Sequence, residues 1–265
     1  MLKQAAIRLL RQARILRYAE QIRYRLALRR GRAGKELFQK THAGVALPPE
    51  EVLYDAWGGL NWDNYWTSGQ ASASYLARII KTHLRGGAVL EWGCGPARIV
   101  RHLPGALGAD FQVIGTDYNR SAIAWCKEHV KGVRFEENQL APPLPFEDAS
   151  VACVYAISVF THLPETEHYS WIRHLFRLLE PGGLLIFSTH SDATRRQLFA
   201  GERRAYDSGA LVVRGNVEEG RRTFLAYHPI PFVRKLLSDF EILRHEPSPV
   251  PILYLQDLWI ARKPG

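Results

Sequence analysis

Two acidic residues and two glycines occur in a pattern that could bind a nucleoside. A short apolar run ends in Glu91, and Gly93 and Gly95 follow it before a predicted helix. Glycines in such a turn let the backbone approach a ligand closely, and the helix start offers free amide donors. The next apolar run ends in Asp117, whose carboxylate could accept hydrogen bonds from two ribose hydroxyls. Both motifs therefore point at one nucleoside.

The charge of this turn distinguishes between two classes of cofactor. A nicotinamide cofactor brings a pyrophosphate, and its turn usually has a third glycine where this chain has Arg98. Glu91 would also place negative charge beside the phosphates. S-adenosylmethionine instead carries a positive sulfonium and an amino group, which an acidic strand end suits. The turn therefore favours S-adenosylmethionine.

Short apolar runs alternate with helical patterns around these motifs. Strands are predicted at 88–92, 111–116, 133–136, 151–157, 184–188, 241–245 and 253–261, and helices at 72–84, 99–103, 121–130, 171–179 and 232–237. This alternation is typical of βαβ units. The sequence predicts an α/β fold, namely a Rossmann-like, doubly wound, mostly parallel seven-stranded sheet with helices on both faces and an N-terminal basic helix.

At four motifs the sequence resembles the class I S-adenosylmethionine-dependent methyltransferases. They follow the family's order and spacing at 91–95 (EWGCG), 117–118 (DY), 138–146 (NQLAPPLPF) and 179–183 (LEPGG). The similarity extends over roughly residues 69–261. The chain departs from the pattern at Val151-Ala152, where many relatives have Phe-Asp, and at Ala97, where a further glycine is frequent. The resemblance implies an enzyme that uses S-adenosylmethionine, with no metal expected.

The resemblance also implies which residues bind the methionine part of the cofactor. Gly93 and Gly95 would approach it, with Cys94 between them in the same turn. Glu91 would contact its amino group through water. Ala156, at the end of the fourth strand, would line this part of the site through its backbone.

The nucleoside part of the cofactor is assigned in the same way. Asp117 would bind the ribose hydroxyls, and Tyr118 would lie beside the adenine. Asn138 and Gln139 occupy the place where members of the family recognise the edge of the adenine.

Histidines that follow predicted strands are candidates for a general base. Methyl transfer to a hydroxyl needs a group that removes its proton, and open α/β sheets bind ligands at the carboxyl ends of their strands. His162 follows the fourth strand and His190 the fifth, so both are candidate catalytic residues. His162 could instead order the cofactor loop. His228 is a weaker third candidate.

The positive charge of the chain is concentrated at its N-terminus. The net charge is +9, and residues 1–35 hold eleven Lys and Arg against one acid, Glu20, so the remainder is close to neutral. A basic amphipathic helix is predicted over the first thirty residues, with Leu2, Ala6, Leu9, Ala13 and Leu16 on one face. Such a helix could make peripheral contact with an anionic membrane surface or pack against its own domain.

Breaks in the pattern predict the domain organisation. Five glycines and prolines predict a linker over 31–49: Gly31, Gly34, Gly44, Pro48 and Pro49. We therefore expect a helix and linker over 1–45 and a methyltransferase domain over 46–265. Within this domain, residues 191–226 form an arginine-rich insertion expected near the substrate. The aromatic cluster at 57–66 could close a lid over the site or pack a cap on the core.

Three hypotheses for the function follow. The first is an O-methyltransferase that acts on a glycan, a lipid-linked sugar or a small hydroxylated metabolite. The second is a nucleic-acid methyltransferase, which the near-neutral domain and the sequence after the fourth strand, Tyr155-Ala156-Ile157-Ser158, disfavour. The third is an inactive cofactor-binding protein that works through its helix. Three widely spaced cysteines and the absence of a membrane-spanning run favour a cytoplasmic protein, which could associate with the inner membrane surface.

Overall fold

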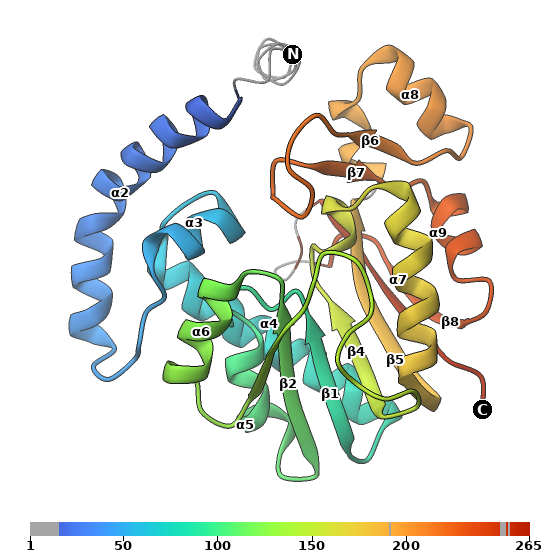
Figure 1. Ribbon diagram of the computed structural model, residues 1–265, viewed down its shortest axis with the longest axis horizontal. Coiled ribbons are helices and arrows are strands. Elements are labelled where there is room, and N and C mark those ends of the chain that lie inside the picture. The colour runs from blue at the N-terminus through green and yellow to red at the C-terminus, as the bar shows by residue number, and fades with distance from the viewer. Residues whose placement is uncertain (1–15, 191, 250–252, 254) are drawn as a thin grey trace.

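The computed structural model describes residues 16–190, 192–249, 253 and 255–265, and it centres on one twisted sheet (Figure 1). The strands lie in the order β3-β2-β1-β4-β5-β9-β8. Their bounds are Gly87–Trp92 (β1), Phe111–Asp117 (β2), Arg134–Glu137 (β3), Val151–Ala156 (β4), Leu179–His190 (β5), Glu241–Glu246 (β8) and Gln256–Arg262 (β9). The pairs among β1 to β5 are parallel, and β9 is antiparallel to both β5 and β8. The predicted mostly parallel, seven-stranded sheet is confirmed.

Helices cover both faces of the sheet, as expected for a doubly wound fold. One hydrophobic core lies between the sheet and the first group of helices: α4 (Trp62–His83), α5 (Leu103–Leu107) and α6 (Arg120–His129). A second core lies between the sheet and α7 (Glu165–Leu178) with α9 (Ile230–Leu236). The central strand β4 is buried along its whole length because it is covered on both faces.

The first described helix, α2 (Leu16–Thr41), corrects the predicted linker. It continues through Gly31 and Gly34, and the loop begins only at residue 42. Gly31 does not end the helix but lets it pack closely on Leu60, since a Cβ at Gly31 would lie 2.8 Å from the Cβ of Leu60. The amphipathic face predicted from Leu2 to Ala13 lies outside the described residues.

The inner side of α2 packs on a small aromatic core that precedes the sheet. Phe38 of α2 is buried with residues of α3 (Glu50–Trp57) and of the start of α4, including Trp62 and Tyr65. The Tyr65 hydroxyl donates a hydrogen bond of 2.6 Å to the carbonyl of Pro96, beside the glycine turn. Most of the aromatic cluster therefore forms a cap on the core.

The insertion forms a separate layer at the carboxyl edge of the sheet (Figure 1). It contains η3 (Asp192–Gln197), α8 (Ala200–Asp207) and the antiparallel pair β6 (Val212–Arg214) and β7 (Leu225–Tyr227). Two short helical turns, η1 (Val100–His102) and η2 (Phe160–His162), follow β1 and β4 at the same edge. The cofactor motifs and the insertion are thus brought to one side of the molecule.

Candidate active site

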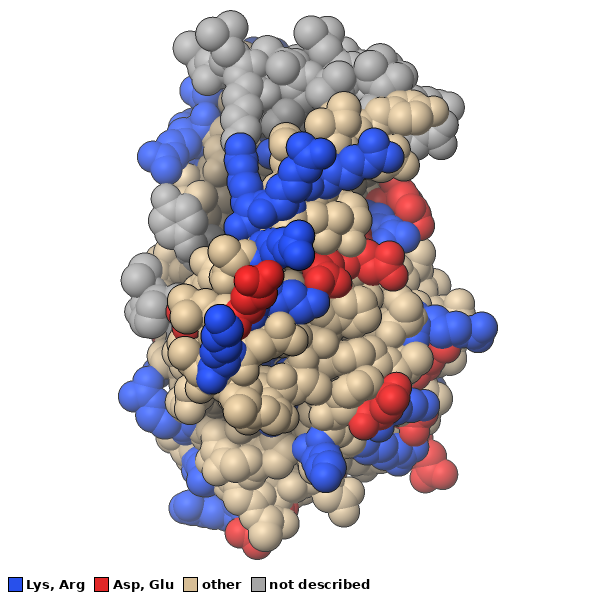
Figure 2. Space-filling model, turned by 90° about the vertical axis from the view of Figure 1, so that its left-hand side faces the viewer, with Lys and Arg blue, Asp and Glu red and all other residues tan. Residues whose placement is uncertain are grey.

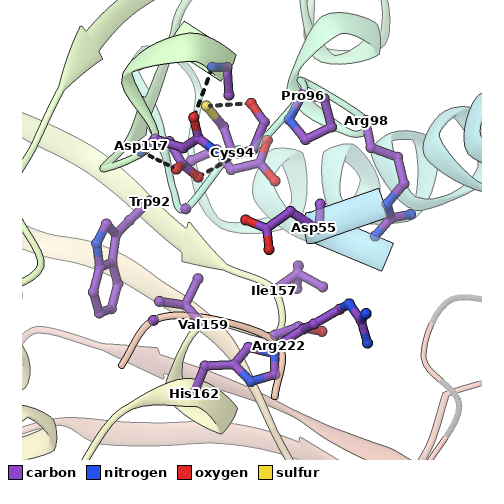
Figure 3. Close-up of a pocket in the computed structure, with 18 of the residues that line it drawn as sticks. Asp55, Trp92, Cys94, Pro96, Arg98, Asp117, Ile157, Val159, His162 and Arg222 are labelled. Atoms are coloured by element: carbon purple, nitrogen blue, oxygen red, sulfur yellow. Dashed lines mark hydrogen bonds between the residues drawn. The ribbon is translucent and has the colours of Figure 1, made fainter. Parts of the chain in front are cut away.

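A cavity of about 580 Å³ lies at the carboxyl ends of β1, β2 and β4 (Figure 3). Nine residues expected at the site line it: Glu91, Gly93, Cys94, Gly95, Asp117, Tyr118, Asn138, Gln139 and His162. They come from separate loops, which the parallel register of the strands brings to one edge.

Glu91 is a buried carboxyl group at the end of β1. One of its oxygens accepts a hydrogen bond of 3.0 Å from the N–H of Val100. Burial raises the pKa of Glu91 to about 8, and the nearby Arg98 guanidinium acts in the opposite direction. A cationic ligand beside Glu91 would favour its charged form, so the position suits an ammonium or sulfonium group better than a phosphate.

Glycine is required at the turn after β1. Gly93 has a φ of 79°, and a Cβ there would lie 2.4 Å from a methyl carbon of Val159. The N–H groups of Gly93 and Cys94 both donate to the carbonyl of Thr116, at 2.8 and 2.9 Å. α4 packs closely behind the turn, since a Cβ on its Gly69 would lie 2.0 Å from the carbonyl oxygen of Arg98.

The Asp117 carboxylate ends β2 and is buried beside this turn. Its two oxygens accept the N–H groups of Gly95, at 2.7 Å, and Asn119, at 2.8 Å. Burial raises the pKa of Asp117, and these two N–H donors act against the rise. Because a carboxylate oxygen can accept more than one hydrogen bond, both oxygens retain capacity for ligand hydroxyls.

The Asn138 side chain is buried at the far end of the cavity. Its amide nitrogen donates to the carbonyl of Gln139 at 2.6 Å, whereas its Oδ1 has no hydrogen-bond partner within the described part of the chain. A buried acceptor without a partner is costly unless a ligand supplies a donor. Tyr118 lies nearby and donates to the carbonyl of Gly220 at 3.2 Å.

His162 lies on the cavity wall in η2 (Figure 3). Its Nδ1 lies 2.7 Å from the carbonyl oxygen of Phe224, which can only accept, so Nδ1 carries the proton. Burial lowers the pKa of His162, and the positive charge of Arg222 contributes in the same direction. The neutral ring therefore leaves Nε2 unprotonated.

Two expected site residues lie away from the cavity. Ala156 is fully buried in the second core, and the next residues, Ile157 and Ser158, line the cavity instead. His190 donates through Nδ1 to the carbonyl of Ala226 at 2.7 Å and stacks on Tyr227. It therefore anchors β7 instead of facing the cavity, which corrects its assignment as a candidate base.

The weaker candidate, His228, is also buried away from the cavity. Its Nε2 lies 2.8 Å from Nε2 of His168, whose Nδ1 in turn lies 2.8 Å from the carbonyl of Pro164. Burial lowers the pKa of both imidazoles, that of His168 to about 4. The pair is a neutral, structural contact between α7 and the short segment that joins β7 to α9.

Several lining residues were not assigned a role from the sequence. Arg98 extends from the turn, and its guanidinium carbon lies 4.8 Å from the ring centre of Trp57. Asp55 of α3 also lines the cavity, as does Arg222, one of the arginines of the insertion that was expected near the substrate. Ser158 and Gln256 line the opposite wall, where they form a hydrogen bond of 3.0 Å. A role for Arg98 could have been suspected from its position just after the glycine turn. Asp55, Ser158 and Gln256 come from distant segments and meet only through tertiary packing.

Ion pairs join the rim of the cavity to the N-terminal helices. Arg221 pairs with Asp55 of α3, and Arg222 pairs with Glu20 of α2. The backbone N–H of Gly220 donates to the carbonyl of His162 at 3.2 Å. The insertion is therefore held across the cavity between α3 and η2.

The described residues contain no group of three or more His, Cys, Asp or Glu side chains that could hold a metal ion. Among their helices, none is both long and apolar enough to cross a membrane. The lining of the cavity fits S-adenosylmethionine by its chemistry, since it offers two buried carboxyls, a glycine turn without Cβ atoms and the unpartnered Asn138 acceptor.

Comparison with known proteins supports this fit. Residues 89–183 match the model of a family described as a methyltransferase domain. A protein of Mycolicibacterium smegmatis, described as a probable S-adenosylmethionine-dependent methyltransferase, is 30% identical over 142 residues, covering 51% of this chain and 49% of that protein. Demethylmenaquinone methyltransferase of Bacillus cytotoxicus is 30% identical over 113 residues, covering 41% of this chain and 47% of that protein. The chain thus spans about half the length of the curated relatives it matches.

A solved structure has the same fold. It is the 1,6-didemethyltoxoflavin-N1-methyltransferase of Burkholderia thailandensis, with bound 1,6-didemethyltoxoflavin and S-adenosylhomocysteine. The TM-score is 0.56 at 16% identity, and the match covers 82% of this chain and 86% of that one. S-adenosylmethionine, the cofactor expected from the sequence, is supported by the match to a methyltransferase domain and by the relative whose description names it. The match over residues 89–183 and the relatives are thus those of S-adenosylmethionine-dependent methyltransferases, and the fold agrees with them.

Proposed function

We propose that the chain transfers a methyl group from S-adenosylmethionine to a hydroxyl of a small hydroxylated metabolite or a glycan, including a lipid-linked sugar. The observation that carries this proposal is the neutral His162 on the cavity wall, with Nδ1 fixed by Phe224 and Nε2 unprotonated. A base is needed only when the acceptor must lose a proton, as a hydroxyl must. A relative and a structural neighbour named as methyltransferases of small molecules support a small-molecule acceptor.

The proposed binding of the methionine part rests on the turn after β1. Gly93 and Gly95 let it approach the backbone, with Cys94 buried between them. Glu91 holds the amino group, and Arg98 binds the carboxylate. Arg98 is suited to this because its guanidinium lies in the cavity lining, and its recorded hydrogen bonds to described residues are two long ones of 3.4 Å, to the hydroxyls of Ser68 and Ser72.

The proposed binding of the nucleoside rests on the ends of β2 and β3. The Asp117 oxygens accept the ribose hydroxyls in addition to the two backbone N–H groups. Asn138 Oδ1 accepts from the amino group of the adenine, which supplies its missing partner. Tyr118 lies beside the adenine, and the exposed Gln139 covers its edge at the rim.

The cofactor, when bound, supplies an electrophilic methyl group on a positively charged sulfur. His162 Nε2 accepts the hydroxyl proton while the acceptor oxygen forms its bond to the methyl carbon and the carbon–sulfur bond breaks. The Phe224 carbonyl keeps the imidazole in the reactive tautomer and stabilises the proton that it gains. The ion pairs of Arg221 and Arg222 hold the insertion over the site, which limits the entry of water.

Transfer of a labelled methyl group from S-adenosylmethionine to small-molecule and cell-envelope extracts tests the proposal. We expect label in products that resist mild alkali, since ethers survive conditions that cleave methyl esters. His162→Gln should lower the rate on the order of 100-fold or more, whereas His129→Gln, on the exposed end of α6, should leave it unchanged. Label only in esters, amines or nucleic acid would contradict hydroxyl methylation, and an unaffected His162→Gln rate would remove the proposed base.

A further inference from the structure

The outer face of α2 carries a row of exposed apolar side chains. Tyr18, Ile22 and Leu26 are 51%, 60% and 43% exposed. Their spacing of four residues places them one above another on the same side of the helix. Leu37, which is 64% exposed, extends this side toward the end of α2. Large apolar side chains on one helix face are unfavourable in water, so the row indicates a contact surface.

Within the described part of the chain, Ile22, Leu26 and Leu37 of this row remain exposed. α2 packs on the aromatic core through its opposite side, where Phe38 is buried and Tyr24 and Leu28 are partly buried. The helix therefore has two apolar sides, of which one is already used.

Arginines interrupt and flank the exposed row. Arg25, Arg29 and Arg30 are exposed, and the structure records no ion pair for them with any described acid. Figure 2 faces this side of the molecule and shows several Lys and Arg side chains gathered on it, with uncharged atoms between them and Asp or Glu beside some of them. The face thus combines apolar side chains with cations that lack counter-ions within the described part of the chain.

We infer that this face of α2, defined by Tyr18, Ile22, Leu26, Arg25, Arg29 and Arg30, docks on an anionic lipid surface. Apolar side chains enter the acyl boundary while arginines pair with acidic headgroups, and both contributions act together in interfacial helices. A nucleic-acid backbone would satisfy the arginines but leave Ile22 and Leu26 in water. The inference does not depend on which acceptor the enzyme methylates.

The docking face is mechanically connected to the rim of the cavity. Glu20, on the inner side of the same helix, pairs with Arg222 and accepts a hydrogen bond of 3.3 Å from the Tyr54 hydroxyl. Docking of α2 would therefore hold the cavity rim close to the lipid surface. This arrangement suits an acceptor that is presented at a membrane.

Sedimentation of the full chain with vesicles tests the inference. The vesicles are made of phosphatidylcholine alone or of phosphatidylcholine with phosphatidylserine. We expect binding only to the second kind, weakened by added salt. Ile22→Ser/Leu26→Ser and, separately, Arg25→Gln/Arg29→Gln/Arg30→Gln should each reduce the bound fraction. The loss should be about fivefold in affinity for each arginine near the surface.

A charge-matched control separates this face from general basicity. Arg173→Gln/Arg234→Gln/Lys235→Gln removes the same charge from exposed positions on α7 and α9, on the other side of the molecule (Figure 1). This variant should bind vesicles like the unaltered chain, and unchanged circular dichroism shows that the variants fold. The inference is overturned if the chain ignores phosphatidylserine, if the control loses as much binding as the arginine variant, or if Ile22→Ser/Leu26→Ser binds normally.

Discussion

The Asp117 carboxylate accepts the backbone N–H of Gly95 at 2.7 Å, across 22 residues of sequence. This bond joins the end of β2 to the glycine turn after β1. The two cofactor motifs therefore form one rigid unit, in which the proposed ribose ligand also supports the turn that approaches the methionine part. A change at Asp117 should consequently affect both binding and stability.

Asp117→Ala should weaken the binding of S-adenosylhomocysteine roughly 100-fold, because hydrogen bonds to a charged group are worth ~1.5–3 kcal/mol each. It should also lower the free energy of unfolding by about 1–3 kcal/mol, since the N–H groups of Gly95 and Asn119 lose their acceptor. Calorimetry and urea unfolding measure the two effects. Asp110→Ala, at an exposed position before β2, is the matched control. Unchanged affinity would rule out the ribose assignment.

Gly93→Ala should destabilise the protein and weaken cofactor binding. The left-handed backbone costs an L-residue ~1–2 kcal/mol, and the new Cβ would meet Val159 at 2.4 Å. Gly105→Ala should have little effect, because nothing lies within 4 Å of its Cβ position. Adding Val159→Ala to Gly93→Ala should restore part of the affinity. No recovery in urea unfolding or calorimetry would show that the clash is not the cause.

Arg98→Met should distinguish two ligands of the same cavity. S-adenosylhomocysteine carries the carboxylate that Arg98 is proposed to bind, whereas 5′-methylthioadenosine lacks the amino acid part. We expect a loss on the order of tenfold to 100-fold for the first, as for other charged hydrogen bonds, and little change for the second. Competition calorimetry compares them in one variant. An equal loss for both ligands would mean that Arg98 acts only on the shape of the turn.

Acid should destabilise the fold through its buried histidines. Burial lowers the pKa of His190 to about 4 from an ordinary value of 6.5, and that of His168 likewise to about 4. Between pH 4 and pH 6.5 the unfolded chain binds more protons than the folded chain. The contribution of the neutral histidines to stability is therefore complete above pH 6.5 and is lost as the pH falls toward 4. The slope is about 1.4 kcal/mol per pH unit for each such group.

Urea unfolding at several pH values measures this loss. His190→Gln should reduce the slope of unfolding free energy against pH by ~1.4 kcal/mol per pH unit, the equivalent of one bound proton. His129→Gln, on the exposed end of α6, should leave this slope unaltered. A free energy of unfolding that does not change between pH 6.5 and 4 would contradict the buried, neutral state of these imidazoles.

The sheet, and the meeting of most of the expected cofactor residues at one cavity, were predictable because their signals are local. An apolar run that ends in Glu91, glycines at 93 and 95 and an acid after the next run fix a strand, a turn and a second strand. The linker predicted from Gly31 and Gly34 was wrong because its signal was local while the decisive contact was not. The contact that keeps the helix intact, between Gly31 and Leu60, lies outside any local window.

The acceptor side of the site depended on tertiary structure. His162 and His190 follow neighbouring strands in the same way, and only the packing of the insertion separates them, with His162 on the cavity wall and His190 under β7. Asp55 and Arg222 come from distant segments that meet at the rim. No spacing in the sequence relates them.

Calorimetric titration of the unaltered chain with S-adenosylmethionine, beside NADH as the phosphate-bearing alternative, tests the central claim most directly. The buried carboxyls of Glu91 and Asp117, the glycine turn and the unpartnered Asn138 acceptor predict saturable binding of S-adenosylmethionine at one site and no heat with NADH. Binding of NADH, or no heat from S-adenosylmethionine with a folded protein, would contradict it.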